Sequence, residues 1–312
     1  MIATVTLNPC YDKTLVIERF VHGGMNRVLE SRQDLCGKGI NVSVALSGLG
    51  MPSVCLGFNF ERDAAELVQT VNKYGMKDDF VLCPGGIRVN AKLFERDTGI
   101  MTEINEKGDF VSQDHFGALK VKVSEHSKGA GIIVFSGSVP KGVDEGCYAE
   151  LIEAARRGNP DVKIILDAEG PSLLSGIKAG PNIIKPNLFE LETLFSTSIL
   201  NREHIVSKCR ELISAYKIEM ACVSLGDEGA VIIGPESAYY AEPLPITVRG
   251  LQGAGDSMVA GICISIIYEK PLDEILRYAV TAASASIEHE GTLLCTEDDF
   301  TRLYPQVIIQ KL

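Results

Sequence analysis

The segment GLQGAGDSMVAG, residues 250–261, decides the fold of this 312-residue chain, because a glycine-rich turn runs directly into an apolar helical pattern. The small residues Gly253, Ala254 and Gly255 let the backbone approach a ligand closely, and the first amides of the following helix lack partners inside it. Unpaired amides and the positive end of the helix dipole together favour an anion. Asp256 falls in the first helical turn, where a carboxylate would also serve as an ordinary capping group. The segment therefore predicts either a general base beside a phosphoryl-binding cradle or a capped core helix.

Composition and charge exclude several classes of protein. The chain is 46% hydrophobic and 23% charged, which is typical of a globular protein. Its formal net charge of −11 and its lack of a basic block argue against nucleic-acid binding. No apolar run reaches membrane-spanning length, and residues 1–7 predict a strand instead of an export signal. The nine cysteines are dispersed and form no C-x-x-C pair, so we expect a cytoplasmic protein without a nucleic-acid or membrane partner.

Apolar runs of strand length alternate with helical patterns along most of the chain. The expected strands are 1–7, 53–58, 79–83, 131–135, 162–167, 182–185 and 220–224. The expected helices are 42–49, 63–74, 114–127, 144–157, 187–195, 202–216 and 258–268. Continuous apolar runs such as 131–135 indicate strands buried on both faces, which is typical of a parallel sheet between helices. The sequence therefore predicts a doubly wound, mainly parallel α/β fold.

One stretch departs from this rhythm and predicts a second, smaller sheet. Residues 88–94 alternate with period two and turn into 100–105, which indicates a hairpin with one solvated face. Extended pieces at 14–20 and 27–34 supply further strands. We therefore expect a β lid formed by two insertions. The lid is expected at 11–34 and 88–105, and the core at 1–10, 35–87 and 106–312.

The alternation within the hairpin places Arg88, Asn90 and Lys92 on one face of the lid. Cations are informative in an acidic chain, since an acidic enzyme that binds phosphates must concentrate its few positive charges at the site. An ordinary solvated face would show the same pattern, however. The pattern leaves a binding face and a polar surface as alternatives.

Two motifs in the second half of the chain also have two interpretations. Asn187 and Glu190 follow a buried strand with the spacing of a capping box, but the same pair could order water around a metal ion bound to nucleotide phosphates. Gly226 and Gly229 follow the strand that ends at Ser224. They indicate either a β-turn or a backbone that approaches a nucleotide.

Other chemistries lack their signatures in the sequence. The five histidines show no metal-ligand spacing, and neither a G-x-x-x-x-G-K-[ST] motif nor a G-x-G-x-x-G motif opens the first helix. The segment 136–138, Ser-Gly-Ser, lacks the G-x-S-x-G frame of a nucleophile elbow. Glycine turns at strand ends, cations on a lid and a carboxylate at a helix start suit phosphoryl transfer, whose catalysis is mainly positioning and charge neutralisation.

These motifs resemble those of the ribokinase-like sugar kinases of the phosphofructokinase B type, nearly from end to end. Within that family they are most similar to the 1-phosphofructokinase branch. The matching segments are 6–12, 24–27, 37–42, 88–93, 136–140, 185–190, 223–230 and 253–257. The segments 37–41 and 253–256 are each fairly specific, and their order and separation make the resemblance strong.

The resemblance implies a role for each matching residue. Asp256 is expected to take the proton from the sugar hydroxyl, while the amides of Gly253, Ala254 and Gly255 form the anion hole. Around the sugar phosphate the expected contacts are Asp12, Arg27, Gly37, Lys38, Gly39, Asn41, Arg88, Asn90 and Ser138. Around the nucleotide they are Lys185, Asn187, Ser224, Gly226 and Gly229, with Glu190 ordering hydrated Mg²⁺.

The implied reaction is ATP-dependent phosphorylation of the 6-hydroxyl of D-fructose 1-phosphate to fructose 1,6-bisphosphate. Tagatose 6-phosphate and fructose 6-phosphate are alternative substrates, since a pocket that grips one phosphate and presents the opposite hydroxyl can accept several ketohexose phosphates. A non-catalytic sugar-phosphate sensor on the same fold is a further alternative. The resemblance also implies a lid that closes over the sugar and that can pair two subunits as a homodimer.

Three segments depart from the family pattern. Leu251 and Gln252 stand where the family usually has a Thr-Val-like pair, and Gln252 is expected to alter a nucleotide contact. Residues 61–66 replace a G-x-D-x-x-G motif, which predicts a changed loop. The segment 289–291, His-Glu-Gly, replaces a more neutral one near the adenine or monovalent-ion region. These departures bear on nucleotide preference more than on catalysis.

Overall fold

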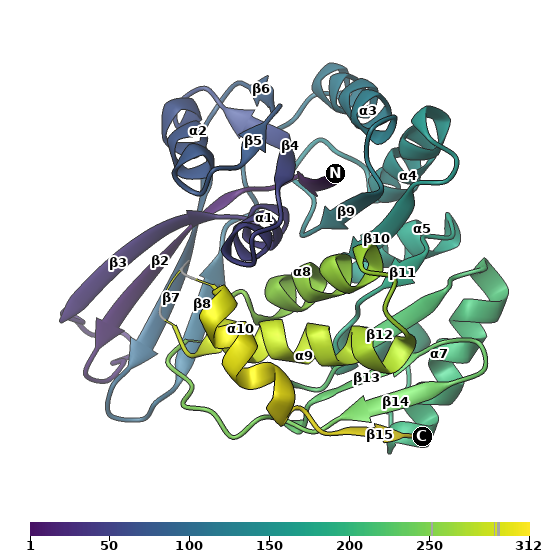
Figure 1. The fold of residues 1–312 in the computed structure, drawn as a ribbon. Helices are drawn as coiled ribbons and strands as arrows, with labels where there is room; N and C mark the ends of the chain where they lie inside the picture. The colour runs from purple at the N-terminus through teal and green to yellow at the C-terminus, as the bar shows by residue number, and fades with distance from the viewer. Residues whose placement is uncertain (251, 290, 292–293) are drawn as a thin grey trace.

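A large, mainly parallel sheet forms the centre of the protein (Figure 1). The structure is a computed structural model that describes residues 1–250, 252–289, 291 and 294–312. Within these residues the strand order is β15-β14-β13-β12-β11-β10-β9-β1-β4-β5, and β6 pairs with the end of β4. The strands are β1 (Ile2–Thr6), β4 (Ser53–Phe60), β5 (Lys77–Asp78), β6 (Val81–Cys83), β9 (Ile132–Ser136), β10 (Lys163–Asp167), β11 (Ile183–Ile184), β12 (Met220–Ser224), β13 (Ala230–Ile233), β14 (Ala238–Ala241) and β15 (Ile309–Lys311).

Helices cover both faces of this sheet. They are α1 (Lys38–Gly48), α2 (Ala64–Lys73), α3 (Gln113–Ser127), α4 (Cys147–Gly158), α5 (Gly170–Lys178), α6 (Leu188–Phe195), α7 (Arg202–Tyr216), α8 (Ala254–Ile267), α9 (Leu272–Ile287) and α10 (Glu297–Leu303), with short 3₁₀ turns at Gly226–Glu228 and Tyr304–Gln306. α1, α8 and α9 pack together on one side, and α3, α4, α5 and α7 form the layer on the other. Every residue of β1 and β9 is buried, as strands between two helical layers require. The predicted doubly wound α/β fold is confirmed.

A second sheet of four strands extends from the left of the core in Figure 1. Its order is β3 (Glu30–Cys36), β2 (Cys10–Ile17), β7 (Arg88–Glu95) and β8 (Met101–Asn105). β2 pairs with β7 in parallel, and the two outer pairings are antiparallel. β8 is exposed along its whole length. The predicted small sheet is therefore present, and it draws on residues 10–36 and 88–105.

Several predicted elements differ in their bounds, among them the strand at 79–83 and the helices at 42–49 and 258–268, the last of which begins at Ala254. The strand expected at 79–83 is two short strands, β5 and β6, and the carboxylate of Asp79 between them binds Lys122 and His126. The helix expected at 42–49 begins at Lys38 instead. A Cβ at Gly39 would lie 2.8 Å from the carbonyl oxygen of Val5, so a residue that disfavours helices is required where α1 approaches β1.

Several elements in the second half have no counterpart among the predicted ones. They are α5, α9, α10, β13, β14 and β15. The three strands are antiparallel and only three or four residues long, so their apolar runs are too short to show a period. α9 buries Ile275, Leu276 and Ala279 at helical spacing, so the apolar pattern of its sequence is sufficient to predict a helix. None of the helices in the described part of the chain has the length and apolar character needed to span a membrane.

The contact between α8 and α9 generates a stability prediction, because α8 carries Asp256. A Cβ at Gly261 would lie 2.5 Å from the carbonyl oxygen of Tyr278 on α9. Gly261→Ala is therefore expected to force the helices apart and to lower the free energy of unfolding by about 1–3 kcal/mol. Denaturant unfolding measures this change.

The matched control is Gly117→Ala in α3, where an added Cβ meets no described atom within 4 Å. There the substitution is expected to stabilise the protein by about 0.5–1 kcal/mol, because alanine favours the helix. Equal effects at the two positions would contradict the proposed close approach of α8 and α9.

Candidate active site

Parallel strands of the main sheet bring polar residues to one edge. Thr6 ends β1, Ser136 ends β9 and Asp167 ends β10, and the pairing register aligns these three residues across the sheet. Parallel strands present their carboxyl ends at the same edge, which is where α/β sheets bind ligands. All three side chains are buried. This edge is the floor of the candidate site.

Asp256 lies above this edge, in the first turn of α8. The helix begins after Gly253, whose φ of +75° gives the left-handed turn that a glycine permits. The Asp256 carboxylate is buried, and its Oδ2 accepts a hydrogen bond from Asn41 Nδ2 at 2.8 Å. Burial, followed by repulsion from Asp167, raises the pKa of Asp256 to about 6, although Lys38, Asn41 and Lys185 oppose the increase. The carboxylate therefore changes protonation just below neutral pH.

An ion cluster centred on the buried carboxylate of Asp167 faces Asp256. The Asp167 carboxylate lies 3.4 Å from Lys38 Nζ and 3.2 Å from Lys185 Nζ. Burial alone would raise the pKa of Asp167, but the two lysines outweigh it and hold that pKa below its usual value. The Asp167 carboxylate in turn raises the pKa of Lys38. Both lysines are thus held in place beside the start of α8.

The small sheet contributes a second carboxylate, Asp12 on β2. Its Oδ1 accepts a hydrogen bond from Asn90 Nδ2 at 3.0 Å, and its Oδ2 pairs with Lys92 Nζ at 2.7 Å. Gln252, just before α8, also donates to Oδ2. Asp12 is 6% exposed, so its charge depends on these partners. Asp12 thereby links the small sheet to the turn that precedes α8.

Arg88 occupies the other end of the same face. Its guanidinium donates to the Glu106 carbonyl at 2.7 Å and to Ser138 Oγ at 3.2 Å, while its buried Nε has no partner among the described residues. Asn8 Oδ1, Asn90 Oδ1 and Ser136 Oγ are likewise buried without a partner in the described part of the chain. Unpaired buried polar atoms are costly, so their gathering here indicates a polar ligand.

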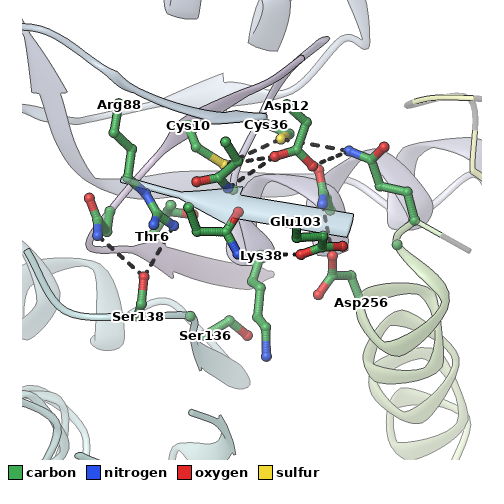
Figure 2. Close-up of a pocket in the computed structure, with 18 of the residues that line it drawn as sticks. Thr6, Cys10, Asp12, Cys36, Lys38, Arg88, Glu103, Ser136, Ser138 and Asp256 are labelled. Atoms are coloured by element: carbon green, nitrogen blue, oxygen red, sulfur yellow. Dashed lines mark hydrogen bonds between the residues drawn. The ribbon is translucent and has the colours of Figure 1, made fainter. Parts of the chain in front are cut away.

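These groups surround a cavity of about 360 Å³, which is large enough for a small ligand. Figure 2 shows that Lys38, Arg88, Ser138 and Asp256 lie around it from different elements. Its lining residues are Thr6, Asn8, Cys10, Asp12, Cys36, Gly37, Lys38, Asn41, Arg88, Asn90, Lys92, Glu103, Asn105, Ser136, Gly137, Ser138, Glu169, Gln252, Gly253 and Asp256. The cavity is therefore shared between the main sheet, the start of α8 and the small sheet.

The predicted nucleotide residues lie along a neighbouring stretch of the sheet edge, outside the residues that line the cavity. Asn187 and Glu190 form a complete capping box at the start of α6, so their structural role is present. Burial raises the pKa of Glu190, against the effect of Lys38 and Lys185. Asn187 also forms a parallel bridge with Ser224.

The two glycines of the predicted turn differ in their surroundings. Both have positive φ, +67° at Gly226 and +90° at Gly229. A Cβ at Gly229 would lie 2.1 Å from the Ala241 carbonyl oxygen, so this glycine is required by the packing against β14. A Cβ at Gly226 meets no described atom within 4 Å, so its surface is open to a ligand. The turn and a ligand approach are therefore both compatible with this loop.

Seven of the nine predicted sugar-side residues line the cavity, and Gly39 and Arg27 do not. The cavity is lined by Asp12, Gly37, Lys38, Asn41, Arg88, Asn90 and Ser138, and Gly39 is buried against β1. Arg27 instead lies exposed on the loop between β2 and β3, away from the cavity lining. Its sequence position beside a glycine turn does not bring it to the cavity.

Several residues of the site had not been singled out in the sequence. Asp167 is the main one, and an acidic residue directly after the apolar run 164–166 was the available signal. Gln252, which is expected to alter a nucleotide contact, donates to Asp12 of the small sheet. Glu103, from β8, and the thiols of Cys10 and Cys36 also line the cavity. No local motif marks these three, because they meet only through the strand pairing.

The other segments that depart from the family pattern form ordinary hydrogen bonds and ion pairs in the structure. In the changed loop 61–66, Asp63 accepts a hydrogen bond from the Ile87 amide at 2.7 Å, and Glu66 accepts one from the Tyr11 hydroxyl at 2.7 Å. His289 pairs with Asp299 at 2.7 Å. Leu251 and Glu290 lie outside the described residues.

Comparison with known proteins agrees with this geometry. The pattern of the pfkB family carbohydrate kinases matches residues 5–299. The chain is 33% identical to the 1-phosphofructokinase of Bacillus subtilis, covering all of both chains, and 28% identical to the ATP-dependent 6-phosphofructokinase isozyme 2 of Escherichia coli, covering 97% of each. The solved structure of phosphofructokinase-2 from Escherichia coli in complex with substrates and products is similar with a TM-score of 0.90, at 28% identity and 98% coverage of each chain. The chain therefore belongs to the pfkB family of carbohydrate kinases.

Proposed function

We propose that this protein is an ATP-dependent kinase that phosphorylates the 6-hydroxyl of D-fructose 1-phosphate, giving fructose 1,6-bisphosphate. The observation that carries this proposal is Asp256, a buried carboxylate at the amide-rich start of α8 that faces a polar cavity. Relatives named 1-phosphofructokinase that match the whole length of the chain support the choice of substrate.

In the proposed mechanism, Asp256 acts as the general base. It takes the proton from the sugar hydroxyl as that oxygen bonds to the terminal phosphorus of ATP and ADP leaves. Asn41 orients the carboxylate through its 2.8 Å hydrogen bond. A pKa of about 6 suits this role, because the group is ionised at neutral pH and is still basic enough to accept a proton.

The transferring phosphoryl group would lie at the start of α8. The amides of Gly253, Ala254 and Gly255 lie at the start of a long buried helix, where the first amides have no partner within the helix, and would form the anion hole. Lys185 Nζ lies 3.4 Å from the Cβ position of Gly255, so a cation stands beside these amides. We propose that the lysine neutralises phosphate charge there.

The sugar phosphate would occupy the cavity itself. Asp12, Gly39 and Asn41 would contact its hydroxyls, and Gly37 allows the chain to pass close to it. Its 1-phosphate would bind the cationic and polar group formed by Lys38, Arg88, Asn90 and Ser138. The unpartnered Nε of Arg88 supports this assignment, because a phosphate oxygen would satisfy it.

The four-stranded sheet is proposed as a lid over the sugar, formed by the insertions at 11–34 and 88–105. Its loops carry exposed apolar side chains that could pair two subunits. They are Phe20, Val21, Met25, Val28 and Leu29, with Ile100, Met101 and Ile104 on the hairpin. A relative from Escherichia coli has been solved in a tetrameric inhibited form. In a lid homodimer, Arg27 would act from the exposed loop between β2 and β3.

ATP would lie along the ends of β11 and β12, against Lys185, Asn187, Ser224, Gly226 and Gly229. The open surface at Gly226 supports this placement. Glu190 would order hydrated Mg²⁺, since carboxylate oxygens suit this hard cation. When bound, Mg²⁺ would neutralise part of the negative charge of the ATP phosphates. The capping role of Glu190 uses Oε2, which leaves Oε1 for water.

Two alternatives are tested by the same assays. Fructose 6-phosphate and tagatose 6-phosphate carry the phosphate on carbon 6 and the free primary hydroxyl on carbon 1. This is the reverse of the arrangement in fructose 1-phosphate. A non-catalytic sensor is disfavoured, because the carboxylate and the helix start that such a protein would lose are both intact.

Comparing the sugars tests the substrate directly. With ATP and Mg²⁺, kcat/KM for fructose 1-phosphate is expected to exceed that for fructose 6-phosphate and tagatose 6-phosphate, measured by coupled ADP release. Unphosphorylated fructose is expected to be a poor substrate, because it leaves Lys38 and Arg88 without an anion. A preference for either 6-phosphate would refute the assignment.

Replacing the base tests the mechanism. Asp256→Asn is expected to lower kcat about 10²–10⁴-fold while the affinity for the sugar phosphate changes little, because it removes proton abstraction and keeps the shape of the side chain. Single-turnover assays and calorimetric binding measure the two effects. Asp298→Asn, which changes an exposed carboxylate in the first turn of α10, is the matched control. Turnover that survives in Asp256→Asn would show that another group is the base.

The pH profile tests the electrostatic environment of Asp256. Because the base must be ionised, kcat/KM is expected to rise with pH through about 6 and then to level off. Asp167→Asn removes a negative charge that raises the pKa of Asp256, so the rise is expected to move to lower pH. Asp298→Asn is again the control and is expected to leave the profile in place. A rise that stays fixed or moves to higher pH in Asp167→Asn would contradict this arrangement.

A further inference from the structure

Two cysteines face each other inside the cavity, at the place where β2 and β3 join the core. Cys10 and Cys36 are directly paired across the antiparallel strands, and their Sγ atoms lie 3.5 Å apart. Both are buried, at 5% and 2% exposure, and both line the cavity. The mechanism proposed above uses neither thiol.

Asp12 completes a group of three potential metal ligands. Its Oδ1 lies 3.5 Å from Cys10 Sγ, and the ligand atoms of Cys10, Asp12 and Cys36 all lie within 4.8 Å of one another. This is the only buried group of that kind found in the described residues. Bonds of about 2.3 Å to sulfur and about 2.0 Å to oxygen at tetrahedral angles would separate two sulfurs by roughly 3.8 Å and a sulfur from the oxygen by roughly 3.5 Å. The 3.5 Å separations of Cys10 Sγ from Cys36 Sγ and from Asp12 Oδ1 are close to these values, so small side-chain adjustments would admit a tetrahedral ion.

The surroundings of Asp12 also suit a bound cation. Oδ1 lies beside Cys10 Sγ and also accepts a hydrogen bond from Asn90 Nδ2, whereas Lys92 and Gln252 bind the other oxygen, Oδ2. Partners on the second oxygen would hold the carboxylate in its ligating orientation. Two thiolates and one carboxylate with a divalent ion carry a net charge of −1, which the charge of Lys92 balances. The cavity supplies the entry path and leaves a fourth position for water.

We propose that Cys10, Cys36 and Asp12 form a binding site for a thiophilic divalent cation of the zinc class. On binding, each thiol releases its proton to solvent as its sulfur bonds to the metal, so two protons are released for one ion. The ligand set of two sulfurs and one oxygen distinguishes this site from a magnesium site, which takes oxygen ligands.

An ion at this position would occupy the carboxylate that the proposed function assigns to the sugar hydroxyls. Its binding would therefore inhibit the enzyme in competition with the sugar phosphate and not with ATP. This consequence rests on the proposed function, whereas the metal site itself does not.

Cadmium titration tests the site without using activity. The reduced, chelator-treated full chain is titrated with Cd²⁺ while the ultraviolet thiolate-to-cadmium charge-transfer band is recorded, and Zn²⁺ is then added as a competitor. We expect a band that saturates at one equivalent, is displaced by Zn²⁺ and is unaffected by excess Mg²⁺. Cys10→Ala and Cys36→Ala are expected to weaken Cd²⁺ binding about 100-fold or more. The matched control, Cys83→Ala, removes a fully buried thiol elsewhere and is expected to bind as the parent does.

Three results would overturn the proposal: no stoichiometric band, an equal band in Cys10→Ala and Cys36→Ala, or a Cys10–Cys36 disulfide that still forms while the reduced protein binds no metal. Should either alanine variant fail to fold in a thermal melt, Cys10→Ser replaces it.

A second experiment adds Zn²⁺ to the kinase assay. We expect a higher KM for fructose 1-phosphate and an unchanged KM for ATP. If the parent has no kinase activity, the proposed function fails while the cadmium titration still reports on the site.

Discussion

The ion cluster of Lys38, Asp167 and Lys185 is the interaction on which the candidate site depends. It joins the start of α1 to the ends of β10 and β11, and the side chains of Asp167 and Lys185 are buried. Buried charges are tolerated only when they are paired, so each member fixes the position of the others. With Asp256 ionised, the two carboxylates and two lysines sum to zero. This balance explains why the pKa of Asp256 stays near 6 although the group is buried.

The second organising constraint is that two sheets meet at one cavity. The main sheet supplies its carboxyl edge and the helix starts that follow it, and the small sheet supplies a polar face. Asp12 connects them, because Gln252 from the turn before α8 donates to a carboxylate on β2. A shift of the small sheet would therefore alter the turn before α8, where the anion hole is proposed. In the proposed mechanism, this contact would couple ligand binding to the alignment of the phosphoryl group.

Local sequence patterns were sufficient for some of this arrangement and not for the rest. The α/β alternation, the hairpin at 88–105 and the placement of Asp256 at a helix start follow from periodicity and capping, which act over a few residues. Asp167, Glu103 and the Cys10–Cys36 pair are different, because strand register and tertiary packing bring them to the cavity. Arg27 is another case, since its motif match does not determine the direction of its loop, and it lies outside the cavity lining of its own chain.

The parallel pairing of β2 with β7 has a consequence for biosynthesis. Asp12 and Asn90 are neighbours in the small sheet but 78 positions apart in the chain, and the intervening residues build α1, β4 and α2 of the core. As the nascent polypeptide leaves the ribosome, β2 and β3 emerge first and present an open edge until β7 arrives. Unpaired edges of this kind invite association between chains, and such long-range closure is slow. The small sheet therefore exposes an unpaired strand edge during translation, which chaperones that bind nascent chains would protect.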